Sequence, residues 1–251
     1  MRRWGAILLI VVLSSVASDA AELKVLAALV LQDALGRLGP DFARERGDTV
    51  EIACSTVGAI RQRLAAGERA DVVVLTSDAV EALDRSGALA ASAPVAATRT
   101  GVAIRAGAAA PAIATIEQFR AALLAARSIA YTDPRTGGAF GTYFAGELAR
   151  MGIAEAVNAK AVLRRGSHEI VKSVASGEAE LGVTFISTIV STPGVEVAGP
   201  LPPPLTGTEP FSAGVLADSP ARDAALAFMR ALRSGEARAV WTALGFEAAS
   251  P

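Results

Sequence analysis

The chain has 251 residues, of which 52% are hydrophobic and 20% are charged, and its formal net charge is −1 at pH 7. A nearly neutral chain without a basic stripe is not expected to bind nucleic acid. The single cysteine, Cys54, excludes an intramolecular disulfide, and the single histidine, His168, excludes a zinc site built from cysteines and histidines. We therefore expect neither a metal nor a cofactor, and we expect Cys54 to be a buried structural thiol.

The N-terminal segment has the three parts of a secretory signal peptide. Two arginines follow the initial methionine, residues 6–13 form an uninterrupted apolar run, and small residues come next. Cleavage is expected after Ala20 or one residue later, which assigns residues 1–21 to the signal peptide. An uncleaved membrane anchor is the alternative, but the apolar run is shorter than the roughly 20 residues of a membrane-spanning helix. The sequence therefore predicts a periplasmic protein.

Short strands and helices alternate in the first part of the mature chain. Short apolar runs predict strands at 23–28, 50–54 and 71–75. Apolar residues at helical spacing predict helices at 30–46 and 58–66, each followed by a glycine. This βαβαβ order predicts a parallel sheet covered by helices.

A second alternation begins near Thr98. Further strands are predicted at 101–105, 128–131, 160–163 and 181–185. Helices are predicted at 116–126, where Thr115 is the expected N-cap, and at 142–151 and 170–176.

The C-terminal part returns to the first unit. A proline-rich segment at 200–204 indicates a crossing or hinge, a last strand contains Val215, and two helices are expected within 222–244. The whole pattern predicts two α/β lobes. The first comprises residues 22–99 and 206–251, and the second comprises residues 100–205.

Motifs along nearly all of the mature chain, in the same order, resemble the periplasmic molybdate-binding proteins. The matching segments are 24–28, 55–61 and 66–73 for the first lobe, 131–134, 148–153 and 177–182 for the second, and 235–237 and 244–246 at the C-terminal end. The resemblance implies a two-lobed type II periplasmic binding-protein fold. Each lobe is then a mixed, mainly parallel sheet flanked by helices, with the ligand in the cleft between them.

Three strand-to-helix turns are expected to face that cleft, at 55–58, 136–142 and 165–168. Each helix start offers free N–H groups and the positive end of a helix dipole, which together suit an anion. Any one of these turns could be an ordinary loop that contains glycine. Three such turns around one cleft, however, favour contact with a ligand. The residues expected to bind the ligand are Ala28, Val30, Ser55, Thr56, Gly58, Arg61, Thr76, Gly137, Gly138, Tyr143, Gly166, Ser167 and Phe185.

Three positions depart from the oxyanion-binding members of the family. Those members have two serines and a tyrosine where this chain has Val30, Val57 and Phe185. Each lost hydroxyl removes a hydrogen bond to a buried oxyanion, at a cost of about 1–3 kcal/mol. We therefore expect a small organic anion that carries carboxylates rather than molybdate.

A divergent branch of the same family is similar in three further segments, 58–61, 126–131 and 193–195. That branch includes aconitate isomerase, a periplasmic enzyme that moves a double bond between the cis and trans forms of a tricarboxylate. The resemblance implies a second hypothesis, an isomerase that shifts a proton within an allylic system.

Such a shift needs one base that removes and returns a proton. His168 and Tyr143 are the leading candidates for it, followed by Glu169 and Asp133. Arginine forks are suited to hold the carboxylates, and the candidates are Arg61, Arg99, Arg135, Arg164 and Arg165.

Passive capture of a small anion remains the leading hypothesis, and the question of enzymatic activity stays open. The sequence has neither a nucleophile elbow nor a phosphate-loop lysine motif. As a binding protein it is expected to be a monomer whose lobes close over the ligand. It would then deliver the ligand to the permease of a membrane transporter.

Overall fold

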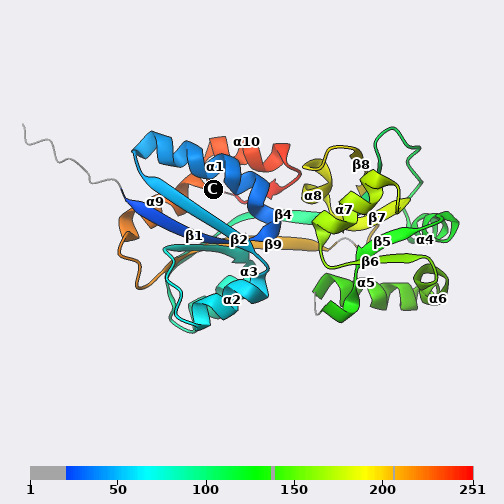
Figure 1. Cartoon of the computed structure of the whole chain (residues 1–251), viewed down its shortest axis with the longest axis horizontal. Coiled ribbons are helices and arrows are strands. Elements are labelled where there is room, and N and C mark those ends of the chain that lie inside the picture. The colour runs from blue at the N-terminus through cyan, green and yellow to red at the C-terminus, as the bar shows by residue number, and fades with distance from the viewer. Residues whose placement is uncertain (1–20, 137–138, 206, 251) are drawn as a thin grey trace, which may run out of the picture.

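The computed structural model describes residues 21–136, 139–205 and 207–250, so most of the predicted signal peptide lies outside it. Within these residues the strands form one ten-stranded sheet in the order β2-β1-β3-β9-β4-β7-β5-β6, with β8 and β10 both paired to β4. Figure 1 shows this sheet as two groups of strands joined through β4 and β9. The predicted α/β, two-lobed architecture is confirmed.

The first lobe is built on three parallel strands, β1 (Glu22–Ala28), β2 (Thr49–Ser55) and β3 (Val72–Thr76). The helices between and after them are α1 (Gln32–Arg46), α2 (Val57–Ala65) and α3 (Ser77–Arg85), with a short 3₁₀ turn at Leu29–Leu31. Helix α1 ends at Gly47, whose φ of 72° is left-handed backbone that glycine adopts without steric cost. The predicted βαβαβ unit is therefore present.

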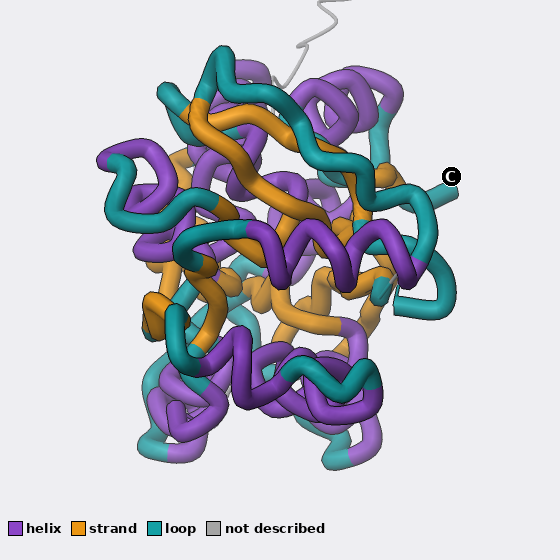
Figure 2. The backbone as a smooth tube through the Cα atoms, turned by 90° about the vertical axis from the view of Figure 1, so that its right-hand side faces the viewer, coloured by secondary structure: helices purple, strands orange, loops and turns teal. Residues whose placement is uncertain are grey.

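The second lobe repeats this arrangement with strands β5 (Ile129–Thr132), β6 (Ala161–Arg164) and β7 (Leu181–Phe185), which are parallel to one another, and β8 (Val195–Pro200). Its helices are α4 (Ile116–Ala125), α5 (Ala139–Arg150), α6 (Ala154–Asn158), α7 (Ser167–Ser176) and α8 (Ile186–Val190). The expected N-cap is present, since the Thr115 hydroxyl accepts a hydrogen bond from the Gln118 N–H at 3.2 Å. Seen from this end, helices cover both faces of the strands (Figure 2).

A single long strand, β4 (Leu89–Arg105), belongs to both groups of strands. Its first part pairs antiparallel with β9 (Thr208–Leu216), from Leu89 to Arg99, and its last part pairs with β7 and β8. The sequence predicted only 101–105, because the preceding segment is rich in alanine and has a proline, which are poor strand formers. Pairing on both sides decides its conformation. The predicted lobe limits fall within β4 and before β9, and they stay a prediction.

The C-terminal helices α9 (Arg222–Ala231) and α10 (Gly235–Ala243) and the short strand β10 (Glu247–Ala248) lie against the first lobe (Figure 1). One apolar cluster combines Leu23 and Leu35 from the start of the chain with Phe228 and Trp241 from its end. A second cluster in the other lobe centres on Phe144. Each group of strands thus has its own core.

Two predicted helices begin three residues earlier than expected. Helix α5 starts at Ala139 rather than 142, and α7 starts at Ser167 rather than 170. Their first turns consist mostly of small or polar residues, and Phe140 alone does not establish an apolar period, so periodicity does not detect them. Strand β8 was not predicted at all.

Cys54 is half-buried on β2 and packs against the core of the first lobe. Burial raises the pKa of its thiol above the usual value, with a further contribution from the Asp33 carboxylate. A thiol that stays protonated is a poor nucleophile, which favours the structural interpretation. Among the described residues, no helix is long and apolar enough to cross a membrane.

An ion-pair cluster joins β1 to the loop after α2. Glu68 accepts hydrogen bonds from the Arg63 guanidinium at 2.5 Å and 2.6 Å, and the Lys24 ammonium lies 2.8 Å away. Together these cations lower the pKa of the Glu68 carboxyl from its usual 4.5 to about 2.

We expect this cluster to contribute acid sensitivity to the protein. Because the folded-state pKa lies below the unfolded value, the stabilisation is present above pH 4.5 and is lost as the pH falls to about 2. Between about pH 5 and pH 2, the Glu68→Gln variant should therefore lose less unfolding free energy than the wild type. The midpoints of urea unfolding at each pH measure this difference. An equal loss in the two proteins would contradict the assignment, and Glu81→Gln, on an exposed face of α3, is the matched control.

Candidate functional site

The carboxyl ends of the first three strands lie along one edge of the first lobe. Ala28 pairs with Ser55 across β1 and β2, and Ala27 pairs with Val74 across β1 and β3, which places Thr76 at the same edge. Ser55 and Thr76 are half-buried there. Parallel sheets place ligands outside this edge.

The two turns that follow β1 and β2 provide the other predicted residues of this lobe. The Thr56 hydroxyl caps α2 by accepting a hydrogen bond from the Ala59 N–H at 3.2 Å. Gly58 is exposed in the first turn of α2, and a Cβ there would meet nothing within 4 Å. Val30 and Val57 are half-buried and pack against the apolar core. At these two positions the chain therefore offers apolar contact instead of hydroxyl donors.

The second lobe presents the carboxyl ends of β5, β6 and β7 at one edge. Thr132 pairs with Arg164, and Ala130 pairs with Gly182, so that Asp133, Arg165 and Phe185 come next at neighbouring strand ends. Such an edge brings together side chains that are distant in sequence.

Helix α7 starts at this edge with N–H groups that no side chain caps. Gly166 is its N-cap residue and makes no side-chain capping bond, while Ser167 and His168 are half-buried in the first turn. The predicted residues Gly137 and Gly138 lie outside the described part of the chain. An uncapped helix start suits a carboxylate.

A polar pocket of about 560 Å³ lies beside α7 and is lined by Asp133, Arg135, Leu163, Arg164, Arg165 and Glu169. We call it the arginine pocket. The Arg135 guanidinium lies 2.8 Å from Asp133 and lowers the pKa of that carboxyl. Arg164 pairs with Glu178 and donates to the Ser173 hydroxyl at 2.8 Å. Within the described residues, no ion pair involves the exposed Arg165, which leaves its guanidinium available to a ligand.

A second pocket, of about 210 Å³, lies where β4 passes from one lobe to the other. Its lining comes from both groups of strands and from α5, and consists of Thr100, Phe140, Tyr143, Phe185, Gly207, Thr208 and Glu209. We call it the crossover pocket. On β4, Thr98 stands opposite Glu209 and Thr100 stands opposite Phe185, which explains why β7 and β9 meet here.

Aromatic rings form one side of the crossover pocket. The Phe140 ring centroid lies 6.3 Å from that of Tyr143 and 6.1 Å from that of Phe185. Tyr143 is 38% exposed, and burial together with the Glu147 carboxylate raises the pKa of its phenol. The phenol therefore stays protonated at neutral pH and is suited to donate a hydrogen bond.

Glu209 is the acidic residue of the crossover pocket, and the sequence analysis missed it. Burial raises the pKa of its carboxyl, and the neighbouring Asp78 carboxylate raises it further. A lone glutamate between a threonine and a proline gives no sequence pattern that indicates a site. Only the pairing of β9 with β4 places it beside Phe185.

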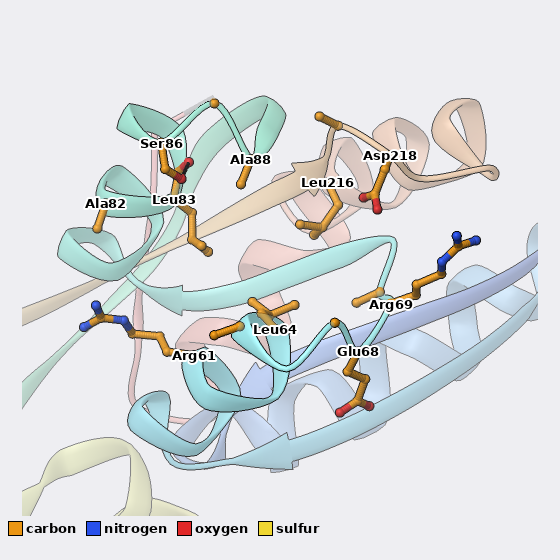
Figure 3. Close-up of a pocket in the computed structure, with 15 residues that line it drawn as sticks. Arg61, Leu64, Glu68, Arg69, Ala82, Leu83, Ser86, Ala88, Leu216 and Asp218 are labelled. Carbon is orange, nitrogen blue, oxygen red and sulfur yellow. Dashed lines mark hydrogen bonds between the residues drawn. The ribbon is translucent and has the colours of Figure 1, made fainter.

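Of the thirteen residues expected to bind the ligand, only Tyr143 and Phe185 line either pocket in the described part of the chain. His168 lines neither pocket. Arg61 is exposed and lies at one end of a groove of about 690 Å³ between α2 and α3, whose other end carries Arg69 (Figure 3). Leu64, Leu83 and Leu216 point into this groove (Figure 3). Arg61 therefore lies at a different groove from the two pockets, and its contact with a ligand stays a prediction.

Arg99 also has a partner, since its guanidinium lies 2.8 Å from the Glu247 carboxylate. Of the cationic candidates, Arg99, Arg135 and Arg164 are thus engaged in ion pairs within the protein. Among the described residues, no group of three or more histidine, cysteine, aspartate or glutamate side chains is arranged to hold a metal ion.

The chain matches the model of the family described as bacterial extracellular solute-binding protein over residues 23–247. It belongs to this family. The match covers all the described strands except the first residue of β1 and the last residue of β10, so the pockets described above lie within the family's fold. The predicted membership of a solute-binding-protein family is confirmed.

Individual relatives include both an enzyme and binding proteins. The chain is 30% identical over 241 residues to an aconitate isomerase from Pseudomonas sp., covering 93% of this chain and 90% of that protein. A periplasmic molybdate-binding protein from Azotobacter vinelandii has a TM-score of 0.70 and 21% identity, covering 89% of this chain and 98% of that one.

A third relative is the substrate-binding domain of a putative molybdenum ABC transporter from Clostridium difficile. It has a TM-score of 0.74 and 17% identity, covering 92% of this chain and 100% of that one. At these identities the two structures show the fold alone.

Proposed function

We propose that the chain binds a small organic polycarboxylate between its two lobes. The crossover pocket carries this proposal, because three of its seven lining residues have aromatic rings and three have hydroxyl groups, so that it offers both apolar surface and hydrogen-bond donors. A tetrahedral oxyanion needs a hydrogen bond to nearly every oxygen, whereas an organic acid also offers carbon to apolar walls. Val30 and Val57, both packed into the core, fit the same preference.

The anionic groups of such a ligand have suitable partners at the lobe edges. The uncapped start of α7 provides N–H groups, and Arg165 provides a guanidinium without an internal partner among the described residues. On the first lobe, Ala28, Ser55 and Thr76 lie at the carboxyl ends of β1, β2 and β3, where a ligand can contact them. The remaining predicted residues, Gly58, Gly166 and Ser167, lie in the first turns or caps of the helices that follow such strands.

Mature protein should be stabilised by one class of ligand. In a thermal-shift series, we expect tricarboxylates at millimolar concentration to raise the melting temperature by several degrees, whereas molybdate and sulfate should not. Stabilisation by molybdate alone would overturn the ligand class. Absence of a shift with every anion would count against binding itself.

The cellular setting is part of the same proposal. Residues 1–21 act as a cleaved signal peptide, and the monomeric mature protein works in the periplasm. There it passes its ligand to the permease of an ABC transporter. Its membership of the solute-binding family supports this role. Mass spectrometry of the exported protein should show a new N-terminus after Ala20 or Ala21, and an intact N-terminus would contradict cleavage.

A second candidate function is the interconversion of cis- and trans-aconitate. The observation that favours it is the 30% identity, over nearly the whole chain, to an aconitate isomerase. Incubation of the purified protein with either isomer should then give the equilibrium mixture, followed by liquid chromatography. A trace that does not change with time, at a protein concentration where binding is saturated, would leave capture as the function.

A further inference from the structure

Glu209 has the surroundings of a proton-transferring carboxylate. It lies in the crossover pocket with Phe140, Tyr143 and Phe185, and is half-buried. Within the described residues, no hydrogen bond or ion pair of its carboxylate is found, although the desolvated position disfavours the charged form. A carboxylate kept in such a position without a structural partner is free to act on a ligand.

The charged groups around Glu209 come from two neighbouring elements. On α3, the Asp78 carboxylate adds a like charge. On β4, the nearest arginine, Arg99, follows the residue paired with Glu209, but it is engaged with Glu247. Among the residues that the structure describes, no cation therefore pairs with Glu209, and burial beside a like charge increases its affinity for a proton.

The other candidate bases are less suited to this role. Asp133 is held by both nitrogens of the Arg135 fork, and this partner lowers the pKa of the carboxyl. The Tyr143 phenol has a raised pKa and so is a hydrogen-bond donor at neutral pH. Glu169 accepts a hydrogen bond from the Arg165 N–H at 3.1 Å, which uses its carboxylate locally. His168 does not line the crossover pocket.

We propose that Glu209 is the catalytic base and acid of an allylic proton shift, an inference that rests on the aconitate isomerase candidate. The Glu209 carboxylate takes a proton from the methylene carbon of the substrate, and the C–H bonding electrons become the new carbon–carbon double bond. The electrons of the old double bond move to its far carbon, where protonated Glu209 returns the proton. The atoms and charges of the substrate are unchanged overall, and no co-reactant is consumed.

The pocket assists this shift in two ways. The aromatic rings of Phe140, Tyr143 and Phe185 cover one side of the carbanion, which slows its protonation by water without closing the pocket to solvent exchange. The Tyr143 hydroxyl lines the same pocket and donates a hydrogen bond to the carboxylate on which negative charge develops.

The test compares Glu209→Gln with the wild type and with Glu196→Gln, an exposed glutamate on β8. We expect kcat for aconitate isomerisation to fall by about 10²-fold or more in Glu209→Gln, which is the usual effect of removing a general base. Exchange of the substrate methylene hydrogens in D₂O, followed by NMR, should be lost with it. Calorimetric affinity for aconitate should change by less than about threefold, and Glu196→Gln should match the wild type.

Each possible result has a defined meaning. Isomerisation and exchange by Glu209→Gln at the wild-type rate would overturn the role of Glu209 while leaving the isomerase candidate standing. Wild-type protein that binds aconitate without isomerisation or exchange would overturn both, yet leave polycarboxylate binding intact. If Glu209→Gln does not fold, Glu209→Asp retains a carboxylate one methylene farther away. We expect it to keep slow exchange, and an unchanged kcat would overturn the proposal.

Discussion

The Trp241→Ala variant is expected to lose about 3–5 kcal/mol of unfolding free energy, a range typical of removing a large buried aromatic side chain. Trp241 is fully buried, its indole N–H donates to the Leu232 carbonyl at 3.0 Å, and its ring packs edge-on against Phe246 at 5.2 Å. The same cluster contains strand β1 and helix α1. The substitution therefore weakens contact between the two ends of the chain.

Equilibrium unfolding in urea, followed by circular dichroism, measures this loss. The matched control is Val190→Ala, at a position that is 46% exposed, which should change stability by less than about 0.5 kcal/mol. A loss below about 1 kcal/mol in Trp241→Ala would contradict the view that C-terminal residues complete the first lobe. It would mean that the N-terminal part folds on a core of its own.

Gly141→Ala is the second substitution with a large expected effect. Gly141 is buried in α5 beside the end of β5, and a Cβ there would lie 2.8 Å from the Thr132 carbonyl oxygen and 3.2 Å from Asp133. Both contacts are with backbone, which cannot rotate away as a side chain can. Helix α5 must therefore shift outward, at a cost of about 1–3 kcal/mol.

This shift also moves the crossover pocket, because Phe140 and Tyr143 flank Gly141 on α5. We expect ligand affinity, measured by calorimetry, to fall by about tenfold, or about 1.4 kcal/mol. Gly146→Ala provides a control within the same helix, since a Cβ there meets nothing within 4 Å. It should leave affinity unchanged and stabilise the helix by up to about 1 kcal/mol. Similar behaviour of the two variants would show that close packing of α5 against β5 does not shape the site.

At the three positions where hydroxyl groups were expected in oxyanion-binding members of the family, this chain has apolar side chains. Val30 and Val57 contribute to the core, and Phe185 contributes a ring to the crossover pocket. Each substitution replaces a hydrogen-bond donor by apolar surface, which favours ligands with a carbon skeleton. Restoring the donors one at a time, beginning with Phe185→Tyr, would move the preference towards inorganic oxyanions.

Much of the fold follows from local pattern. The apolar runs of β1, β3 and β7 and the helical spacing of α1 are visible in the sequence, because buried parallel strands are continuous apolar segments. The same holds for the glycine that ends α1 and for the threonine that caps α4. These features determined the α/β class, whereas the family was inferred from the motifs that resemble the molybdate-binding proteins.

The site depended on contacts that no local pattern records. Strand β4 has alanines and a proline, yet pairing with β9 on one side and with β7 and β8 on the other extends it to 17 residues. That pairing brings Glu209 opposite Thr98 and Phe185 opposite Thr100. A carboxylate more than twenty residues away in sequence thereby joins an aromatic wall, and its burial follows from packing alone.

The sequence alone also could not show which arginines are available to a ligand. Five were candidates from the sequence, where every arginine offers the same planar fork. In the folded chain, Arg99, Arg135 and Arg164 are paired with carboxylates, whereas Arg61 lies on a separate groove and Arg165 remains at the edge of the second lobe. The sequence by itself determined the α/β class and the family, and it led to a prediction of the ligand type. Only the tertiary structure decided which charges remain for that ligand, because an ion pair depends on distances between residues far apart in the chain.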